Sequence, residues 1–297
     1  MRGPVALVGA VGVLLVGGLV GPVTAASARP SVVIGTGGKT CALGPGADCR
    51  DVVHKGNLAF HGNLAGAKFA RARLIGADLS RANLKGANLR SAVLRKVSLA
   101  GANLVDADLG PAARHKTSRD GSSCSPNCQG ADLSGANLTG ANFRNANLYE
   151  ADLYGVNAGN AFFNDANLSK SDMTKAYFAE ANFANANLSE SSPTLAILRK
   201  ATLNGANLYN VYMYASDLTQ AQLVGVAATG AKLGSTILVK ANLTNAVLTN
   251  ADLENADLSG ANLTGATLTG ADLTGVTWSD TTCPDGSVVT GGPCAVS

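Results

Sequence analysis

A single five-residue unit, Ala-Asp/Asn-Leu-X-X, repeats through most of this chain. From Leu133 to Trp278 every fifth residue continues the series, and an earlier run extends from Leu64 to Leu109. Of the forty positions that we name centres, twenty-nine are Leu, five are Phe and two are Met. A period of five matches neither an α-helix nor a β-strand, and it is too short for helix-pair arrays or propeller blades. The pattern therefore predicts a chain that turns at every fifth residue and stacks coil upon coil.

The other positions of the unit are as regular as the centres. Ala stands two residues before thirty of the forty centres, so a small side chain and a large apolar one alternate in each repeat. Asp or Asn precedes twenty-three centres, which is typical of residues that hydrogen-bond to the backbone at turns.

This repeat resembles that of the pentapeptide repeat proteins over residues 62–109 and 131–278. The resemblance implies an all-β fold, a right-handed quadrilateral β-helix with four pentapeptides in each coil. It also implies that the centre and the residue two before it point into the coil, and that the other three positions face solvent. Forty centres then make about ten coils. Phe143, Phe163 and Phe183 are spaced by twenty residues and would stack on one side of such a coil, whereas Phe178 lies outside that series.

The repeat runs and the segments between them predict the organisation of the chain. Gly, Ser, Pro and basic residues dominate the interruption after Leu109, which indicates an exposed loop. Pro193 occupies a centre, and the five-residue spacing continues unchanged on both sides of it. We expect a signal peptide at residues 1–28 and a tether with an N-terminal cap at 29–61. A first repeat run at 62–109, an inserted loop at 110–130, a second run at 131–278 and a C-terminal cap at 279–297 follow.

The first residues have the pattern of a secretory signal peptide. Arg2 supplies a positive charge, Val5–Val20 is apolar and uncharged, and Ala26-Ser27-Ala28 matches a small-residue cleavage site. The alternative is an uncleaved signal anchor, because the apolar stretch is nearly long enough to span a bilayer. We expect the mature chain to be secreted, with no stable membrane span after cleavage.

Six cysteines occur in three close pairs: Cys41 and Cys49, Cys124 and Cys128, and Cys283 and Cys294. In an exported chain an even number of cysteines indicates disulfides, although six allow fifteen pairings. The pairs lie far apart along a stacked rod, so we expect local bridges. Bridged segments before and after the repeats would cover strand edges that otherwise invite end-to-end association. Zinc binding and thiol exchange are the alternatives for the Cys124–Cys128 segment.

The sequence offers no motif of a catalytic, metal or cofactor site. His54, His61 and His115 have no nucleophile motif or metal-ligand partner around them, and no Gly-rich phosphate loop is present. Some β-helix proteins cleave polysaccharides, but their carboxylate cluster has no counterpart here. We therefore expect a protein that is not an enzyme and needs no cofactor.

Charge is distributed unevenly along the chain. Residues 51–120 carry twelve Lys/Arg against five Asp/Glu, whereas residues 121–297 carry seven against fourteen. One interpretation is compositional drift among solvated positions. The other is that the basic end docks on an anionic polymer or lipid headgroups of the cell envelope, through Arg71, Arg73, Arg81, Lys85, Arg90, Arg95 and Lys96.

Tyrosines at outward positions are a second candidate binding surface. With four repeats in each coil, Tyr149 and Tyr209 share one column and Tyr154 and Tyr214 share the next. Tyrosine is favoured at binding surfaces, although scattered surface aromatics are ordinary.

These observations predict a secreted, non-enzymatic solenoid that acts as a monomeric scaffold or binding module. Its partner is an unknown protein or an anionic envelope polymer, and no nucleic acid is expected. The family resemblance supplies an alternative, because some members are DNA mimics that bind and protect DNA gyrase. The signal peptide and the basic N-terminal third depart from that pattern.

Overall fold

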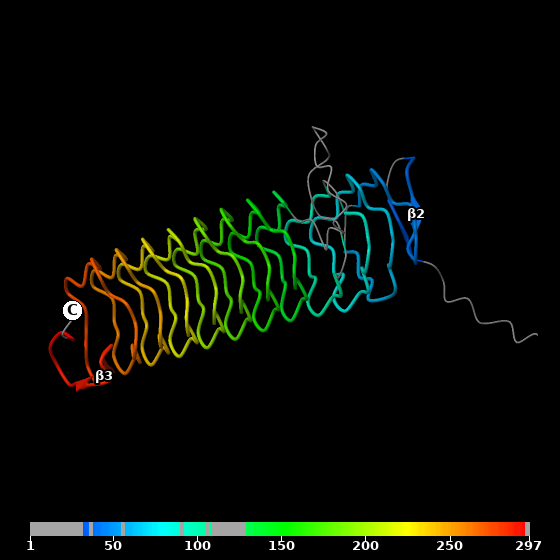
Figure 1. Cartoon of the computed structure of the whole chain (residues 1–297). Coiled ribbons are helices and arrows are strands. Elements are labelled where there is room, and N and C mark those ends of the chain that lie inside the picture. The colour runs from blue at the N-terminus through cyan, green and yellow to red at the C-terminus, as the bar shows by residue number, and fades with distance from the viewer. Residues whose placement is uncertain are drawn as a thin grey trace, which may run out of the picture. The chain divides into compact units, whose positions relative to one another are not determined.

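A computed structural model of the chain describes residues 32–35, 38–54, 57–89, 92–104, 107 and 129–294. All of them belong to the compact unit Val32–Ser297. In this unit the backbone winds into coils that follow one another in chain order (Figure 1). Parallel β-bridges join residues that are twenty apart, as in Asn147, Asn167 and Asn187. Each coil therefore contains four five-residue repeats, and the unit is a four-sided β-helix.

The coil has four walls, each formed by the residues that directly precede the centres. We number the walls in chain order from the start of the second run. Wall 1 passes through Asp132 and Asp152, and wall 2 through Asn137 and Asn157. Wall 3 passes through Asn142 and Phe162, and wall 4 through Asn147 and Asn167.

The inward and outward positions are those that the sequence predicts. Leu203 and Ala201 are fully buried, and the same holds for nearly all centres and small positions of the second run. A turn closes each repeat, as where the amide of Ala206 donates to the carbonyl of Leu203 at 2.9 Å. The second residue after a centre has a positive φ, for example 68° at Gly205. The chain thus changes direction once in every five residues and aims one large side chain inward each time.

Aromatic rings stack in the interior at the predicted spacing. The Phe163 ring lies parallel to those of Phe143 and Phe183, with centroid distances of 5.2 and 4.9 Å. Phe178 meets Phe163 and Phe183 edge-on. The stack confirms four repeats per coil.

Some small inward positions hold a hydroxyl residue instead of alanine. Each buried hydroxyl donates to the carbonyl three residues earlier, so its polar atom has a partner inside the coil. The distances are 2.5–2.7 Å for Ser171, Ser191, Ser216 and Thr236.

The residues before the centres support the walls in two ways. Their side-chain oxygens accept the amide two residues later, as from Ser189 to Asn187 at 3.1 Å. On wall 4 the amide groups of Asn167, Asn187 and Asn207 also donate to the asparagine one coil earlier, at 3.0–3.3 Å. The polar residues of the repeat are therefore turn and ladder elements, as predicted.

The two repeat runs form one stack. Ser98 bridges to Asn137 and Asn103 bridges to Asn142, so coils on either side of the insertion pair directly. Within the predicted loop 110–130, only Gln129 and Gly130 are described. Pro193 keeps its place in the series, because its carbonyl accepts the amide of Ala196 at 3.1 Å.

The stack begins before the predicted first run. Asp48, Val53 and Ala59 already bridge to Lys68, Arg73 and Asp78, although the repeat pattern starts only at residue 62. Here His54 and Phe60 occupy the positions of centres.

Each end carries a short antiparallel hairpin and a disulfide. At the N-terminal end β1 (Val33–Ile34) pairs with β2 (Cys41–Ala42), and Cys41 bonds to Cys49. At the other end β3 (Thr281–Thr282) pairs with β4 (Val288–Val289), and Cys283 bonds to Cys294. These two predicted bridges are confirmed. Cys124 and Cys128, like the predicted signal peptide, lie outside the described residues.

Candidate functional site

Six large apolar or aromatic side chains form an exposed group on walls 1 and 2 of the second run, which we name the apolar patch. Single exposed apolar residues are ordinary, but a contiguous group on a wall is typical of an interaction surface. The members and their exposed fractions are Tyr177 44%, Leu195 49%, Ile197 36%, Tyr212 52%, Tyr214 54% and Ile237 41%.

Coil stacking brings these residues together from separate parts of the chain. Tyr177 bridges directly to Ile197 on wall 2, and Ile237 follows two coils later in the same column. On the adjoining edge of wall 1, the amide of Leu195 donates to the carbonyl of Tyr214 at 3.0 Å. The patch therefore lies on both sides of the edge between two walls, and Asp217 separates Ile237 from Ile197.

Leu195 occupies a backbone position that does not suit it. Its φ is 57°, in the left-handed region that favours Gly, Asn and Asp. Of the described residues with positive φ it is the only large apolar one, since the others are Gly, Ala or polar. A leucine that is half exposed and held in this conformation gains little from the fold, and such strain is concentrated at functional positions.

Asp217 lies in the wall 2 column between Ile197 and Ile237 and is 8% exposed. Its carboxylate accepts bonds from Arg199 Nε at 2.5 Å and from the Thr219 hydroxyl at 2.7 Å. Burial opposes ionisation, but the bonds from Thr219 and Arg199 outweigh it and hold the pKa of the Asp217 carboxyl below its ordinary value. The aspartate is thus a compensated charge between two residues of the apolar patch.

We expect Asp217→Ala to lower the free energy of unfolding by about 1–3 kcal/mol at neutral pH, because Arg199 and the buried turn lose their acceptor. A depressed pKa stabilises the fold above the unfolded value of about 3.9, and this contribution disappears as pH falls through the folded value. Denaturation at pH 7 and in acid measures this effect. The free energies of unfolding of the unchanged protein and of Asp217→Ala should differ at pH 7 and converge in acid. Asp257→Ala, two coils away in the same column, is the control and should cost less. Equal effects of both changes would contradict the buried role of Asp217.

Lysines surround the apolar patch. Lys232 bridges to Tyr212 on wall 1, and Lys200 and Lys240 follow the wall 2 centres Leu198 and Leu238. With Lys175 they make four exposed cations, and Asp172, Glu180 and Glu254 are exposed anions on the same two walls. These lysines lie in a half of the chain that is acidic overall.

The four tyrosines predicted from the sequence as a binding surface fall into two pairs, one with a lysine over the ring and one without. Lys170 lies over the ring of Tyr149 and Lys175 over that of Tyr154, at 5.7 and 5.8 Å from the centroids. The Tyr149 hydroxyl also raises the pKa of the Lys170 ammonium. Tyr209 is 47% exposed, and both it and Tyr214 lack such a covering cation among the described residues. Tyr214 therefore belongs to the patch, and Tyr209 lies at its margin, three residues from Tyr212.

The basic residues of the first run surround the coil and do not gather on one face. By register, Arg71 lies on wall 4, Arg81 on wall 2 and Lys85 on wall 3. Wall 1 carries the remaining described members, Arg73, Arg95 and Lys96, whereas Arg90 lies outside the described residues. Arg71 pairs with Asp51, and Arg95 pairs with Asp132 at 3.1 Å.

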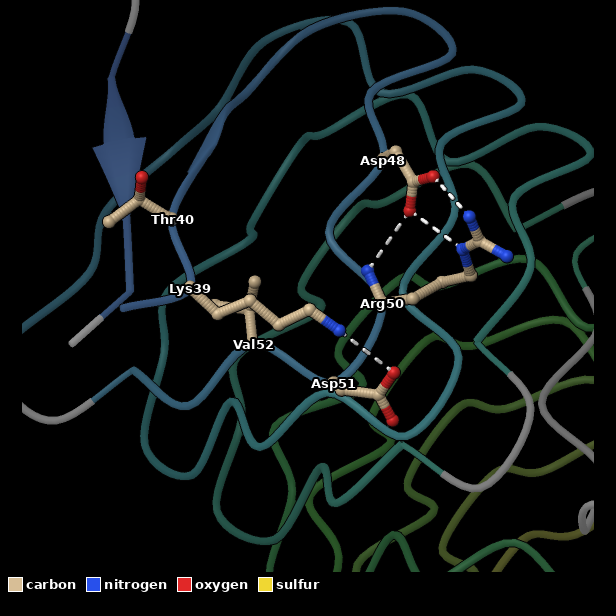
Figure 2. A pocket seen from close by; sticks show the side chains of 6 residues that line it. All are labelled: Lys39, Thr40, Asp48, Arg50, Asp51 and Val52. Carbon is tan, nitrogen blue, oxygen red and sulfur yellow. Dashed lines mark hydrogen bonds and ion pairs between the residues drawn. The ribbon is translucent and has the colours of Figure 1, made fainter. Parts of the chain in front are cut away.

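A recess of about 320 Å³ near the first disulfide is closed by internal ion pairs (Figure 2). Arg50 donates to Asp48 at 2.5 and 2.8 Å, and Lys39 donates to Asp51 at 3.2 Å. The bond from Arg50 lowers the pKa of Asp48 to about 2, and the bond from Arg71 lowers that of Asp51 to about 2. Both carboxylates therefore already have cationic partners, and these ion pairs hold the N-terminal cap in place.

The described residues contain no group of three or more His, Cys, Asp or Glu side chains placed to hold a metal. His61 meets Asp78 at 3.1 Å on the surface. Both ring nitrogens of His54 are buried without a hydrogen-bond partner, inside the first coil. Nor do these residues include a helix with the length and apolar character needed to cross a bilayer.

Comparison with known proteins agrees with this architecture. The family model for pentapeptide repeats matches more than half of the chain, in overlapping segments within residues 63–110, 127–234 and 236–275. The chain belongs to the pentapeptide repeat family. Proteins of this family fold as right-handed quadrilateral β-helices, so the predicted handedness is confirmed as well. No curated protein sequence gave a significant match.

Two solved pentapeptide repeat structures are similar to this chain over most of its length. HetL of the cyanobacterium Nostoc sp. strain PCC 7120, involved in heterocyst differentiation regulation, is 26% identical, with 82% of this chain and 91% of HetL covered and a TM-score of 0.36. QnrB1, a plasmid-mediated fluoroquinolone resistance protein, is 18% identical, with 73% of this chain and 91% of QnrB1 covered and a TM-score of 0.50. The second likeness supports the fold.

Proposed function

We propose that this pentapeptide repeat protein is an exported, non-enzymatic scaffold that binds a protein partner through the apolar patch. The observation that carries the proposal is Leu195, a leucine half exposed at a left-handed position. Polar residues or glycine occupy nearly all equivalent positions, so an apolar side chain there serves contact with something outside the fold. Tyr177, Ile197 and Tyr214 extend that contact around it.

The chemistry of the patch specifies the partner. An apolar centre with exposed tyrosines is typical of the buried part of a protein interface. The exposed Lys200, Lys232 and Lys240 beside it complement carboxylates. The expected partner therefore presents apolar side chains surrounded by Asp or Glu. This surface favours a protein partner over the mimicry of DNA, which requires a largely acidic surface, and thus over the gyrase-binding alternative.

Export is supported by the disulfides Cys41–Cys49 and Cys283–Cys294, because such bonds persist in oxidising compartments. The predicted signal peptide points to the same compartment. We expect protein recovered from the culture medium to lack the residues before the cleavage site near Ala28. Mass spectrometry of its peptides should find both bridges and a third between Cys124 and Cys128. Free thiols, or stoichiometric zinc, would contradict the export proposal.

Affinity capture with matched variants tests the binding role. Leu195→Asp introduces charge into the centre of the patch at a backbone position that Asp tolerates, so the fold should persist. Asn250→Asp makes the same kind of change at another left-handed position, on wall 4. Both the unchanged protein and Asn250→Asp should capture one specific protein from the extracellular fraction, and Leu195→Asp should not. Equal capture by all three would contradict binding through the patch.

A further inference from the structure

A separate hollow of about 420 Å³ lies on wall 1 at the junction of the two repeat runs. It is set apart from the apolar patch along the stack and has different chemistry. The surfaces that line it are mainly apolar, with cationic groups at one end. Its lining residues are Ile75, Arg95, Lys96, Ser134, Gly135 and Tyr154.

The register of the coils creates this hollow. Ile75, Arg95, Ser134 and Tyr154 each come directly after a wall 1 centre, in consecutive coils. The amide of Lys96 donates to the carbonyl of Ser134 at 3.2 Å, which fixes the pairing across the insertion. Ser134 and Gly135 have small side chains or none, so the wall surface is depressed where they lie. The stems of Arg95 and Lys96 stand on one side of this depression and the ring of Tyr154 on the other.

Two cationic side chains, Arg95 and Lys96, line the hollow. Arg95 Nε is 3.1 Å from Asp132 Oδ2 and 3.4 Å from the Ser134 hydroxyl, so its guanidinium is held in place and its charge is compensated. Asp132 also accepts the Ser134 hydroxyl at 2.7 Å. Lys96 has no ion pair among the described residues. The hollow thus combines an oriented guanidinium with an ammonium that has no ion-pair partner in the described part of the chain.

The opposite end is an aromatic surface. Lys175, from the following coil, lies over the Tyr154 ring at 5.8 Å. The hollow is on the other side of Tyr154 along the stack, because Ser134 and Arg95 come from the preceding coils. A ligand with a flat apolar face can therefore stack on the ring from within the hollow, while the ring is held by the lysine behind it.

We infer that this hollow binds a sugar ring that carries a carboxylate, such as a hexuronic acid residue of an acidic polysaccharide. The ring stacks on Tyr154 and covers Ile75, and its carboxylate pairs with Lys96. The straight wall allows neighbouring sugar residues to continue along the coils.

Isothermal titration with trigalacturonate, a short chain of carboxylated sugar rings, tests the inference. The intact mature chain should bind it, and a neutral trisaccharide, maltotriose, should not bind. Lys96→Gln and Tyr154→Ala should each raise the Kd about tenfold or more, since each removes one of the two principal contacts. Lys170→Gln and Tyr149→Ala alter the equivalent repeat positions on wall 4 and should leave the Kd nearly unchanged. Circular dichroism of each variant verifies the fold.

Three results would overturn the inference. Absence of trigalacturonate binding would show that the hollow does not bind carboxylated sugars. An equal loss in the Lys170 and Tyr149 controls would mean non-specific attraction to the whole surface. Equally strong binding of benzoate would assign the hollow to small aromatic acids and would refute the polysaccharide assignment. None of these outcomes bears on the apolar patch, which lies on later coils.

Discussion

Leu203→Asp should lower the free energy of unfolding by about 4 kcal/mol or more, a loss large enough to unfold the surrounding coils. Leu203 is fully buried at a centre, so the new carboxylate would have no water and no partner. Loss of the sharp thermal transition in circular dichroism is the expected measurement.

Leu195→Asp is the matched control, because it makes the same chemical change only eight residues earlier. Leu195 is 49% exposed and has a φ of 57°, which aspartate tolerates better than leucine. We expect its free energy of unfolding to change by no more than about 0.5 kcal/mol. Similar losses in the two variants would show that the inward and outward positions are wrongly assigned.

Phe163→Ala should cost about 3–5 kcal/mol of unfolding free energy, because it opens a cavity in the middle of the aromatic stack. Phe163 contacts Phe143, Phe178 and Phe183 at centroid distances of 5.2, 5.8 and 4.9 Å. Denaturant unfolding followed by circular dichroism measures the difference.

The neighbouring Phe162 provides the control for this cavity. It faces outward on wall 3, where Arg144 lies 4.4 Å above its ring. Phe162→Ala removes that contact alone, so we expect a loss of about 1 kcal/mol. A loss for Phe162→Ala as large as that for Phe163→Ala would contradict the central position of the aromatic stack.

The fold could be predicted from the sequence because its physical cause repeats in every unit. A large apolar residue at each fifth position, with a small one two residues earlier, is compatible with few backbones other than this coil. The N-terminal boundary could not be placed in the same way. His54 and Phe60 act as centres in the first coil without the Ala-X-Leu pattern, and a cap supported by the Cys41–Cys49 disulfide positions them.

The candidate site was less accessible to sequence reasoning, since outward positions have no periodic constraint. The tyrosine columns could be placed from the spacing of twenty, but the covering of Tyr149 and Tyr154 by lysines depends on side-chain geometry. Leu195 carries a signal that the sequence does contain. An alignment of the chain in steps of twenty shows a leucine where the equivalent positions hold Lys175 and Ala215.

The basic residues illustrate the opposite case. Their excess in residues 51–120 is evident from composition, but composition gives no direction around the coil. The structure distributes them over the four walls and joins only Arg95 and Lys96 with Tyr154 in one hollow. Register across the insertion decides this grouping, and the thirty-nine-residue step from Ser98 to Asn137 cannot be derived from a period of five.

The most direct test of the binding role is photo-crosslinking in the native host. A photoreactive phenylalanine analogue would replace Tyr212 in the apolar patch or, as control, the exposed Thr264 on wall 3. We predict that crosslinking from position 212 yields one dominant adduct with an extracellular protein, and that Leu195→Asp in the same chain removes it. No adduct at position 212, or the same adduct at positions 212 and 264, would contradict a binding scaffold that acts through this patch.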